Sequence, residues 1–210
     1  MAQVLHIQAS PRGKVSYSIR AALALLDAYA EAHPGDTVET LDLAVTTLPE
    51  FRGDAAGAKM TLLGGGEPSG DEARAWRDVR QAIERLKRAD KLVVSAPMWN
   101  FGLPYALKHY VDLVVQPRET FRYTEAGKVG GLMKGRPCVL VLARGGRYAP
   151  GTPGEAMDFQ LPYLKAVLGF MGFGPLEVVL VEPTAAEGPD AAQSALTSAL
   201  VEARRIGRTL

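Results

Sequence analysis

Hydroxyl and basic side chains that suit an anionic ligand gather near the start of the chain, in SPRGKVSYS at residues 10–18. Serine hydroxyls and the backbone amides at the start of a helix together bind anions, and Arg12 or Lys14 would add positive charge. Ser16 or Ser18 could instead be only a helix N-cap. The segment matches neither G-x-G-x-x-G nor G-x-x-x-x-G-K-[ST], which excludes a dinucleotide fingerprint and a nucleoside-triphosphate loop. The remaining candidate ligand for this segment is a phosphate monoester, as found in a mononucleotide.

A second segment, PMWNFGLP at residues 97–104, combines large flat side chains with an amide and a constrained backbone. Its prolines and glycine fix the path of the chain around the aromatic residues. A flavin ring needs such surroundings, because its faces pack on apolar groups while its polar edge forms hydrogen bonds. The alternative is a buried loop in which Trp99 and Phe101 complete the core.

The third segment is RGGRY at residues 144–148. Its paired glycines, Gly145 and Gly146, allow the backbone to approach a ligand closely and to present N–H groups to it. Taken alone, a simple strand-ending turn is the better interpretation of this segment.

Alternating strand and helix patterns separate these segments. Apolar runs predict strands, and apolar residues three and four positions apart predict helices. Such alternation is typical of a parallel sheet covered on both faces. We therefore expect an α/β, doubly wound, five-stranded, three-layer single domain over residues 1–210. The expected strands are 3–9, 37–43, 91–96, 137–143 and 176–182, and the expected helices are 18–33, 71–89, 105–115, 158–171 and 190–208.

Two helices have a clear apolar side, and two connections are long. The expected buried residues are Ile19, Leu23, Leu26 and Ala30 in the first helix and Trp76, Val79, Ile83 and Leu86 in the second. The connection 44–70 is long enough to predict a lid or binding loop, with a helical part around 54–62. Residues 116–136 predict a turn-rich insert.

All three polar segments follow predicted strands, namely the first, third and fourth. In open α/β sheets, ligands bind beyond the carboxyl ends of the strands. A single site can therefore collect the three segments if the order of the strands in the sheet allows it.

The charge balance, the cysteine content and the apolar runs limit which partners, ligands and locations are expected. With 24 basic and 23 acidic residues the net charge is +1, which disfavours nucleic acid and anionic membranes. The only cysteine, Cys138, cannot form an internal disulfide, and no metal site is expected. No stretch of about 18 apolar residues occurs, so we expect a cytoplasmic protein. Cys138 and His6 fall in predicted strands and are expected to be structural, whereas His109 is expected to be exposed or interfacial and not catalytic.

Together these residues resemble the FMN-dependent NADH-azoreductases, also described as NADH:quinone oxidoreductases. The resemblance covers nearly the whole chain and implies a homodimer of flavodoxin-like subunits, each holding FMN with contributions from its neighbour. Its marks are SPRGKVSYS at 10–18, PMWNFGLPYALKHYVD at 97–112, FRYTEAG at 121–127, ARGGRY at 143–148 and LPYLKAVLGFMGF at 161–173.

The resemblance also implies roles for individual residues. Phe121 and Phe170 match aromatic positions that line the substrate pocket near the dimer interface. No side chain is expected to be catalytic, because the flavin carries the chemistry. The positions implied to bind FMN are Ser10, Arg12, Ser16, Tyr17 and Ser18 around the phosphate, Pro97, Met98, Trp99, Asn100 and Phe101 along the ring, and Ala143, Arg144, Gly145, Gly146 and Tyr148 near its polar edge.

Three positions depart from the family pattern. Trp99 stands where Tyr is more frequent, and since both side chains are large and flat, flavin binding should survive. Ala143 stands where many members have Ser, so one hydrogen bond to the ring is expected to be missing. Tyr148 occupies a position that is His in some members.

The implied activity is two-electron, ping-pong transfer from NADH, or from NADPH, to quinones or aromatic azo compounds. One alternative is a non-enzymatic electron carrier like flavodoxin. Carriers usually dock through an acidic surface, whereas the charges of this chain are balanced. Another alternative is a flavin-free protein in which the three segments are only turns.

Overall fold

A computed structural model describes residues 1–124 and 127–210 and contains one parallel sheet of five strands in the order β2–β1–β3–β6–β7. The order confirms the expected doubly wound α/β architecture. The chain moves outward from β1 to β2 and then returns to the other side of β1, so the winding reverses between β1 and β3. The strands are β1 Gln3–Gln8, β2 Thr37–Asp42, β3 Lys91–Pro97, β6 Cys138–Ala143 and β7 Leu176–Val181.

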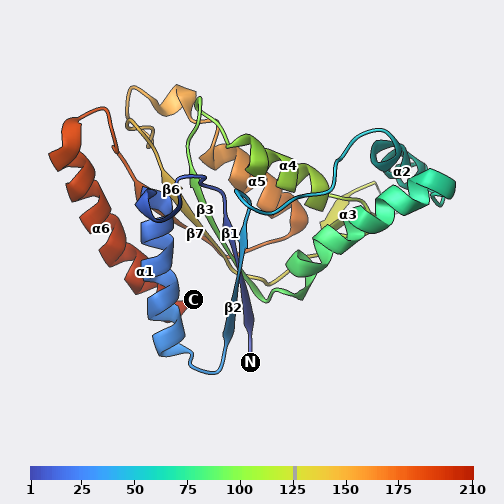
Figure 1. Cartoon of the computed structure of the whole chain (residues 1–210), viewed down its shortest axis with the longest axis horizontal. Helices are drawn as coiled ribbons and strands as arrows, with labels where there is room; N and C mark the ends of the chain where they lie inside the picture. The colour runs from blue at the N-terminus through green and yellow to red at the C-terminus, as the bar shows by residue number, and fades with distance from the viewer. Residues whose placement is uncertain (125–126) are drawn as a thin grey trace.

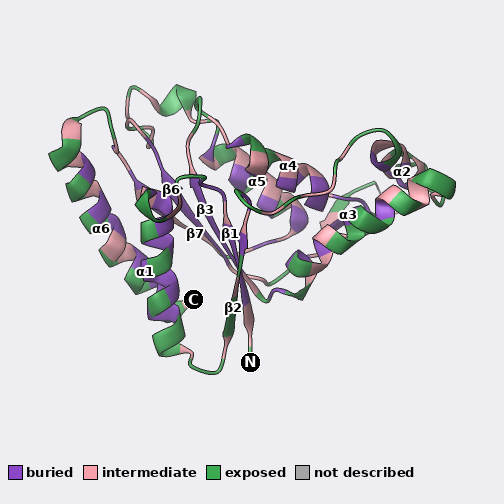
Figure 2. Ribbon diagram, in the orientation of Figure 1, coloured by how far each residue is buried: buried purple, intermediate pink, exposed green. Residues whose placement is uncertain are grey.

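Helices cover both faces of this sheet (Figure 1). Helices α1 (Tyr17–Ala32) and α6 (Gly188–Thr209) pack on one face. Helices α3 (Gly70–Arg88), α4 (Tyr105–Val114) and α5 (Leu161–Met171) pack on the other. The central strands are buried between the two layers, whereas the edge strand β2 is largely exposed (Figure 2). The central strands thus form a rigid base for the loops at their ends.

The two predicted apolar helix faces have different outcomes. Helix α3 buries all four of its expected residues, as predicted. In α1, however, Leu23 is 42% exposed and Ala30 is also exposed, so that part of the prediction was wrong. The buried side of α1 is instead rich in alanine, because α6 crosses it closely. A Cβ on Gly207 of α6 would collide with the carbonyl oxygen of Leu25.

The long connections contain more regular structure than the sequence predicts. Helix α2 (Asp54–Leu63) lies where a helical part was expected. The insert 116–136 contains an antiparallel hairpin of β4 (Phe121–Tyr123) and β5 (Val129–Gly131), which the sequence patterns did not predict. These strands are too short for an alternating pattern to be read. Residues 125 and 126 of the FRYTEAG motif lie outside the described residues.

The helix expected from residue 158 begins later, at Leu161. A short 3-10 helix, Glu155–Met157, precedes it. The Asp158 carboxylate accepts hydrogen bonds from the N–H groups of Gln160 and Leu161, both at 3.0 Å. Asp158 therefore lies ahead of α5, and its side chain holds the start of that helix.

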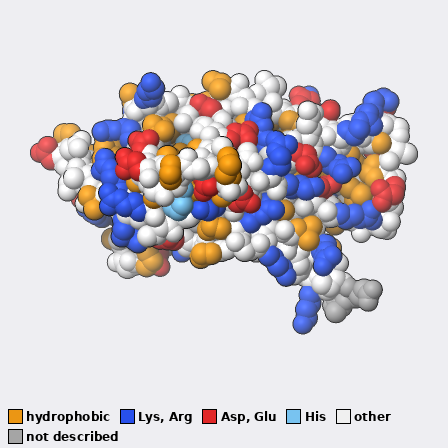
Figure 3. All heavy atoms as spheres, turned by 90° about the horizontal axis from the view of Figure 1, so that it is seen from below, with side chains coloured by type: hydrophobic (Ala, Val, Ile, Leu, Met, Phe, Trp, Pro, Cys, Tyr) orange, Lys and Arg blue, Asp and Glu red, His pale blue; other side chains and the backbone are white. Residues whose placement is uncertain are grey.

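The distribution of surface charge and the burial of the cysteine both match what the sequence predicts. Figure 3 shows basic and acidic side chains intermingled on the face seen from below. None of the helices in residues 1–124 and 127–210 is long and apolar enough to cross a membrane. Cys138 is buried in β6, and burial raises the pKa of its thiol. Its expected structural place is confirmed.

His6 is a buried structural residue of β1, as expected. Its Nε2 lies 2.8 Å from Ser95 Oγ on the neighbouring strand β3. Burial lowers the pKa of His6 from 6.5 to about 4, although the nearby Asp42 acts in the opposite direction. The imidazole is therefore neutral in the folded protein near neutral pH.

This burial predicts a loss of stability in acid. Between pH 6.5 and pH 4 the unfolded chain binds a proton at His6 that the folded chain does not bind. The free energy of unfolding should therefore fall by about 3 kcal/mol across this window because of His6 alone. Replacing His6→Gln should remove that part of the pH dependence, as measured by urea unfolding at neutral pH and at about pH 4.5. His33→Gln, at a half-buried imidazole stacked on Tyr29, is the control. An unchanged acid loss in His6→Gln would contradict the prediction.

Candidate functional site

The strand order brings the three predicted segments to one edge of the sheet. Strands β1, β3 and β6 are direct neighbours, so the loops after them are neighbours too. The N–H of Ala9 donates to the Ser95 carbonyl at 2.9 Å, and the N–H of Met98 donates to the Ala143 carbonyl at 2.7 Å. These bonds continue the sheet beyond the strand ends, so a single site can use all three loops.

The first loop forms a cluster of buried hydroxyls at the start of α1. Ser10, Ser16 and Ser18 are each at most 3% exposed. Ser16 occupies the N-cap position of α1, but its hydroxyl forms no capping bond and lies 3.1 Å from Ser18 Oγ. Ser16 is therefore the N-cap residue by position, as that alternative expected, although its side chain does not cap the helix. The hydroxyls therefore lie beside the first amides of α1, an arrangement that suits an anion.

The remaining predicted residues of this loop flank the hydroxyl cluster. Arg12 and Lys14 are exposed, and Tyr17 is half-buried at the first position of α1. The N–H of Arg12 points back to Ser10 Oγ at 3.4 Å. The backbone therefore curves around the hydroxyls, with the basic side chains free to reach a negatively charged ligand.

The second loop is a tight turn that carries its aromatic side chains outward. Trp99 and Gly102 exchange two backbone hydrogen bonds, of 2.9 and 3.1 Å. The two central residues have positive φ, 47° at Asn100 and 68° at Phe101, as in a type I′ turn. A positive φ is costly for Phe and is typical of functional sites. Trp99 is 39% and Phe101 42% exposed, so the alternative in which they complete the core was wrong.

The third loop presents backbone donors. The Gly145 carbonyl accepts the N–H groups of Ala185 and Ala186, at 3.1 and 2.9 Å, which fixes the turn. The N–H groups of Gly145 and Gly146 have no acceptor among the described residues. A Cβ on Gly145 would meet only the Ala185 side chain, at 4.0 Å. The Gly145 backbone therefore borders open space, whereas a Cβ on Gly146 would contact the Tyr148 ring at 3.5 Å. The Tyr148 ring contacts Phe101 edge to face, at 6.3 Å between ring centroids.

Arg144 is placed differently from the other predicted residues. Its side chain is fully buried and forms ion pairs with Asp158 at 3.0 Å and Glu182 at 3.4 Å. Its N–H donates to the Val181 carbonyl, and its carbonyl accepts from Thr184. Arg144 therefore supports the turn from inside the protein. The sequence patterns missed these supporting acids, because Glu182 and Asp158 occur far apart and in no recognisable motif.

Phe121 and Phe170 are brought together by the hairpin and α5. Their ring centroids lie 4.7 Å apart, with Phe121 buried and Phe170 half-buried. His109 is also half-buried, and its Nε2 lies 2.9 Å from the Pro49 carbonyl. Whether Phe121 and Phe170 contact a substrate stays a prediction.

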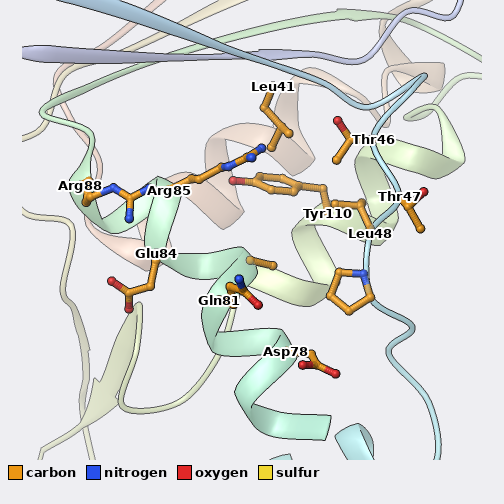
Figure 4. A pocket seen from close by; sticks show the side chains of 12 residues that line it. Leu41, Thr46, Thr47, Leu48, Asp78, Gln81, Glu84, Arg85, Arg88 and Tyr110 are labelled. Atoms are coloured by element: carbon orange, nitrogen blue, oxygen red, sulfur yellow. The ribbon is translucent and has the colours of Figure 1, made fainter.

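A cavity of about 680 Å³ lies elsewhere, between α3, α4 and the loop after β2 (Figure 4). None of the three loops contributes to it. Arg85 and Arg88 share its wall with Asp78 and Glu84, so it favours no single sign of charge. The Tyr110 hydroxyl is buried there and has no hydrogen-bond partner in the described part of the chain. Residues 46–49 line it, and they belong to the connection 44–70 that the sequence predicted to be a lid or binding loop.

Comparison with known proteins agrees with the geometry. The profile of a family described as having a flavodoxin-like fold matches residues 2–206. A relative from Nitratidesulfovibrio vulgaris, named FMN-dependent NADH:quinone oxidoreductase, is 47% identical over 207 residues, 98% of both chains. The chain belongs to this family.

Solved structures extend the comparison within the flavodoxin-like family. An azoreductase from Bacillus anthracis str. Sterne is 31% identical and superposes with a TM-score of 0.89, covering 100% of both chains. An FMN-dependent NADH-azoreductase from Bacillus anthracis str. Ames Ancestor, solved in complex with FMN, is 29% identical, with a TM-score of 0.83 over 99% of this chain and 100% of that one. The resemblance seen in the sequence motifs is thus confirmed.

Proposed function

We propose that this chain is an FMN-dependent oxidoreductase that uses NADH or NADPH to reduce quinones or aromatic azo compounds. The observation that carries the proposal is the meeting of three different loops at one sheet edge. One offers buried hydroxyls, one exposed aromatic rings and one unused backbone donors. The names of the quinone oxidoreductase and azoreductase relatives support the same activity.

The residues present fit FMN part by part. A phosphate monoester suits the hydroxyls of Ser10, Ser16 and Ser18 at the start of α1. A flat ring suits the outward-facing Trp99 and Phe101, and its polar edge suits the N–H groups of Gly145 and Gly146. The group would therefore lie across the carboxyl ends of β1, β3 and β6.

Bound FMN would supply the two-electron chemistry, in which a reduced nicotinamide gives up a hydride and a quinone later gains two electrons and two protons. The chain's own residues bind the FMN and orient its ring. The serines fix the phosphate. The turn of residues 99–102, which we call the aromatic turn, covers the ring and excludes water. The glycine N–H groups stabilise negative charge at the polar edge. We assign no side chain as acid or base. The hydride accounts for both electrons and one of the two protons, and solvent supplies the other proton.

The acceptor is proposed to enter beside aromatic residues. Phe121 and Phe170 form a tilted aromatic pair that would contact a flat, electron-poor quinone or azo compound. An electron carrier would need a docking face for a partner protein. The intermingled charges of the surface favour the enzyme over the carrier.

Absorption spectroscopy tests the proposed function. The purified protein should bind FMN and shift its visible band, NADH or NADPH added without oxygen should bleach the band, and a quinone should restore it. Sustained turnover with no partner protein is expected. Bleaching without reoxidation by any quinone or azo compound would favour the carrier. No FMN binding would contradict the proposal and favour a flavin-free protein.

The phosphate site predicts selective effects of serine variants. Ser16→Ala combined with Ser18→Ala should weaken FMN binding about 10- to 100-fold, because hydrogen bonds to a charged phosphate are lost. Riboflavin, which has no phosphate, should bind the variant and the wild type equally. Fluorescence quenching measures both affinities. Ser69→Ala, at the N-cap of α3 and likewise without a capping bond, is the matched control. Equal losses for FMN and riboflavin would contradict the phosphate role.

A homodimer is proposed as well. Tyr105 follows the aromatic turn in the chain, and Phe159 is hydrogen-bonded to it. Both side chains are large and strongly exposed, and large exposed apolar side chains beside a site can mark an interaction surface. The Phe159 N–H donates to the Phe101 carbonyl, so this apolar group adjoins the proposed flavin site. Sedimentation equilibrium should give twice the chain mass of 22.5 kDa. A species of single chain mass at micromolar concentration would contradict the dimer.

A cytoplasmic location stays a prediction from the sequence, and recovery in a secreted fraction would oppose it.

A further inference from the structure

We propose that Arg144, Asp158 and Glu182 form a buried clamp that holds two turns in position, the aromatic turn and the glycine turn of residues 144–148, and thereby sets flavin affinity and reduction potential. We call these three residues the Arg144 clamp. The inference rests on the proposed function. It makes Arg144 a positioning residue, in place of the direct flavin contact that the sequence resemblance implied.

The clamp is built around one fully buried guanidinium. Arg144 Nη2 lies 3.0 Å from Asp158 Oδ2, and Arg144 Nη1 lies 3.4 Å from Glu182 Oε2. Its Nε donates to Gln160 Oε1 at 3.3 Å. Both carboxylates are less than a tenth exposed. One planar group therefore joins the end of β6, the end of β7 and the segment before α5.

Glu182 extends the clamp to the far end of the glycine turn. Its carboxylate accepts the N–H of Tyr148 at 3.1 Å and the N–H of Ala149 at 3.2 Å. Arg144 precedes Gly145 directly, so the turn is held at both ends by members of one ion pair. The unused N–H groups of Gly145 and Gly146 lie between these two fixed points.

Asp158 extends the clamp to the aromatic turn. The next residue, Phe159, donates its N–H to the Phe101 carbonyl at 3.1 Å. Phe101 is one of the two turn residues with positive φ, a conformation that persists only where surrounding contacts enforce it. The edge-to-face contact between Tyr148 and Phe101 joins the two turns directly.

The charges of the clamp give it an electrostatic effect. One positive and two negative side chains are buried behind the turn whose donors face the polar edge of the ring. Reduced flavin carries more negative charge than oxidised flavin. Removing the positive member should therefore disfavour the reduced form, whereas exchanging the guanidinium for an ammonium should keep the charge and lose the two-pronged geometry.

Arg144→Gln and Arg144→Lys separate charge from geometry. Arg144→Gln should weaken FMN binding at least about tenfold. It should also lower the two-electron potential by about 30 mV, the equivalent of a tenfold change in the ratio of affinities for oxidised and reduced flavin. Arg144→Lys should weaken FMN binding but change that ratio less than about threefold. Fluorescence titration gives the affinity, and equilibration with a reference dye gives the potential.

Arg147→Gln is the matched control, because Arg147 lies in the same turn but forms an exposed ion pair with Glu187. It should leave both quantities unchanged. If the wild type does not bind FMN, the proposed function fails and the clamp with it. If the wild type binds FMN and Arg144→Gln behaves like Arg147→Gln, only the clamp is wrong. If Arg144→Gln does not fold, Arg144→Lys decides: wild-type FMN affinity in that variant overturns the clamp, and weaker binding by folded protein supports it.

Discussion

The parallel pairing of β1, β3 and β6 is the constraint on which the rest of the structure depends. Because these strands run in the same direction and in direct contact, their carboxyl ends meet at one edge. The bonds from Ala9 to Ser95 and from Met98 to Ala143 carry this pairing into the loops. Segments far apart in the sequence thereby become neighbours, at the place where the winding direction of the sheet reverses.

The same edge concentrates features that a purely stable protein would avoid. Hydroxyls are buried without capping a helix, two non-glycine residues adopt positive φ, and aromatic rings face outward. Each feature reduces stability unless the surroundings or a ligand compensate for it. Beneath them, the central strands and the buried ion pairs of Arg144 supply a rigid support. This division between a strained edge and a rigid base is typical of a binding site.

The sequence predicted the five strands of the parallel sheet, their order along the chain and the three loops, because each depends on local patterns. The apolar stripe of α3 was also readable, since one side of that helix is buried and the other is charged. The buried side of α1 was not, because the close crossing of α6 at Gly207 selects small residues there instead of large ones. Likewise, the hairpin at Phe121 depends on pairing between very short strands, which leave no periodic signal.

The candidate site shows the same limit. Ser16, Trp99 and Gly145 could be identified because they occur in dense local motifs that also resemble a known family. The support of Arg144 by Asp158 and Glu182 could not be identified, because it joins positions that only the tertiary structure brings together. Local chemistry is thus readable from the chain, whereas the groups that position it come from packing.

Amide chemical-shift mapping during an FMN titration tests most directly whether all three loops bind one FMN. A single shared site predicts that shifts at residues 10–18, 97–102 and 144–148 appear together and saturate with a single FMN per chain. Shifts that instead gather around Tyr110 and Arg85, in the separate cavity beside α3, would contradict it.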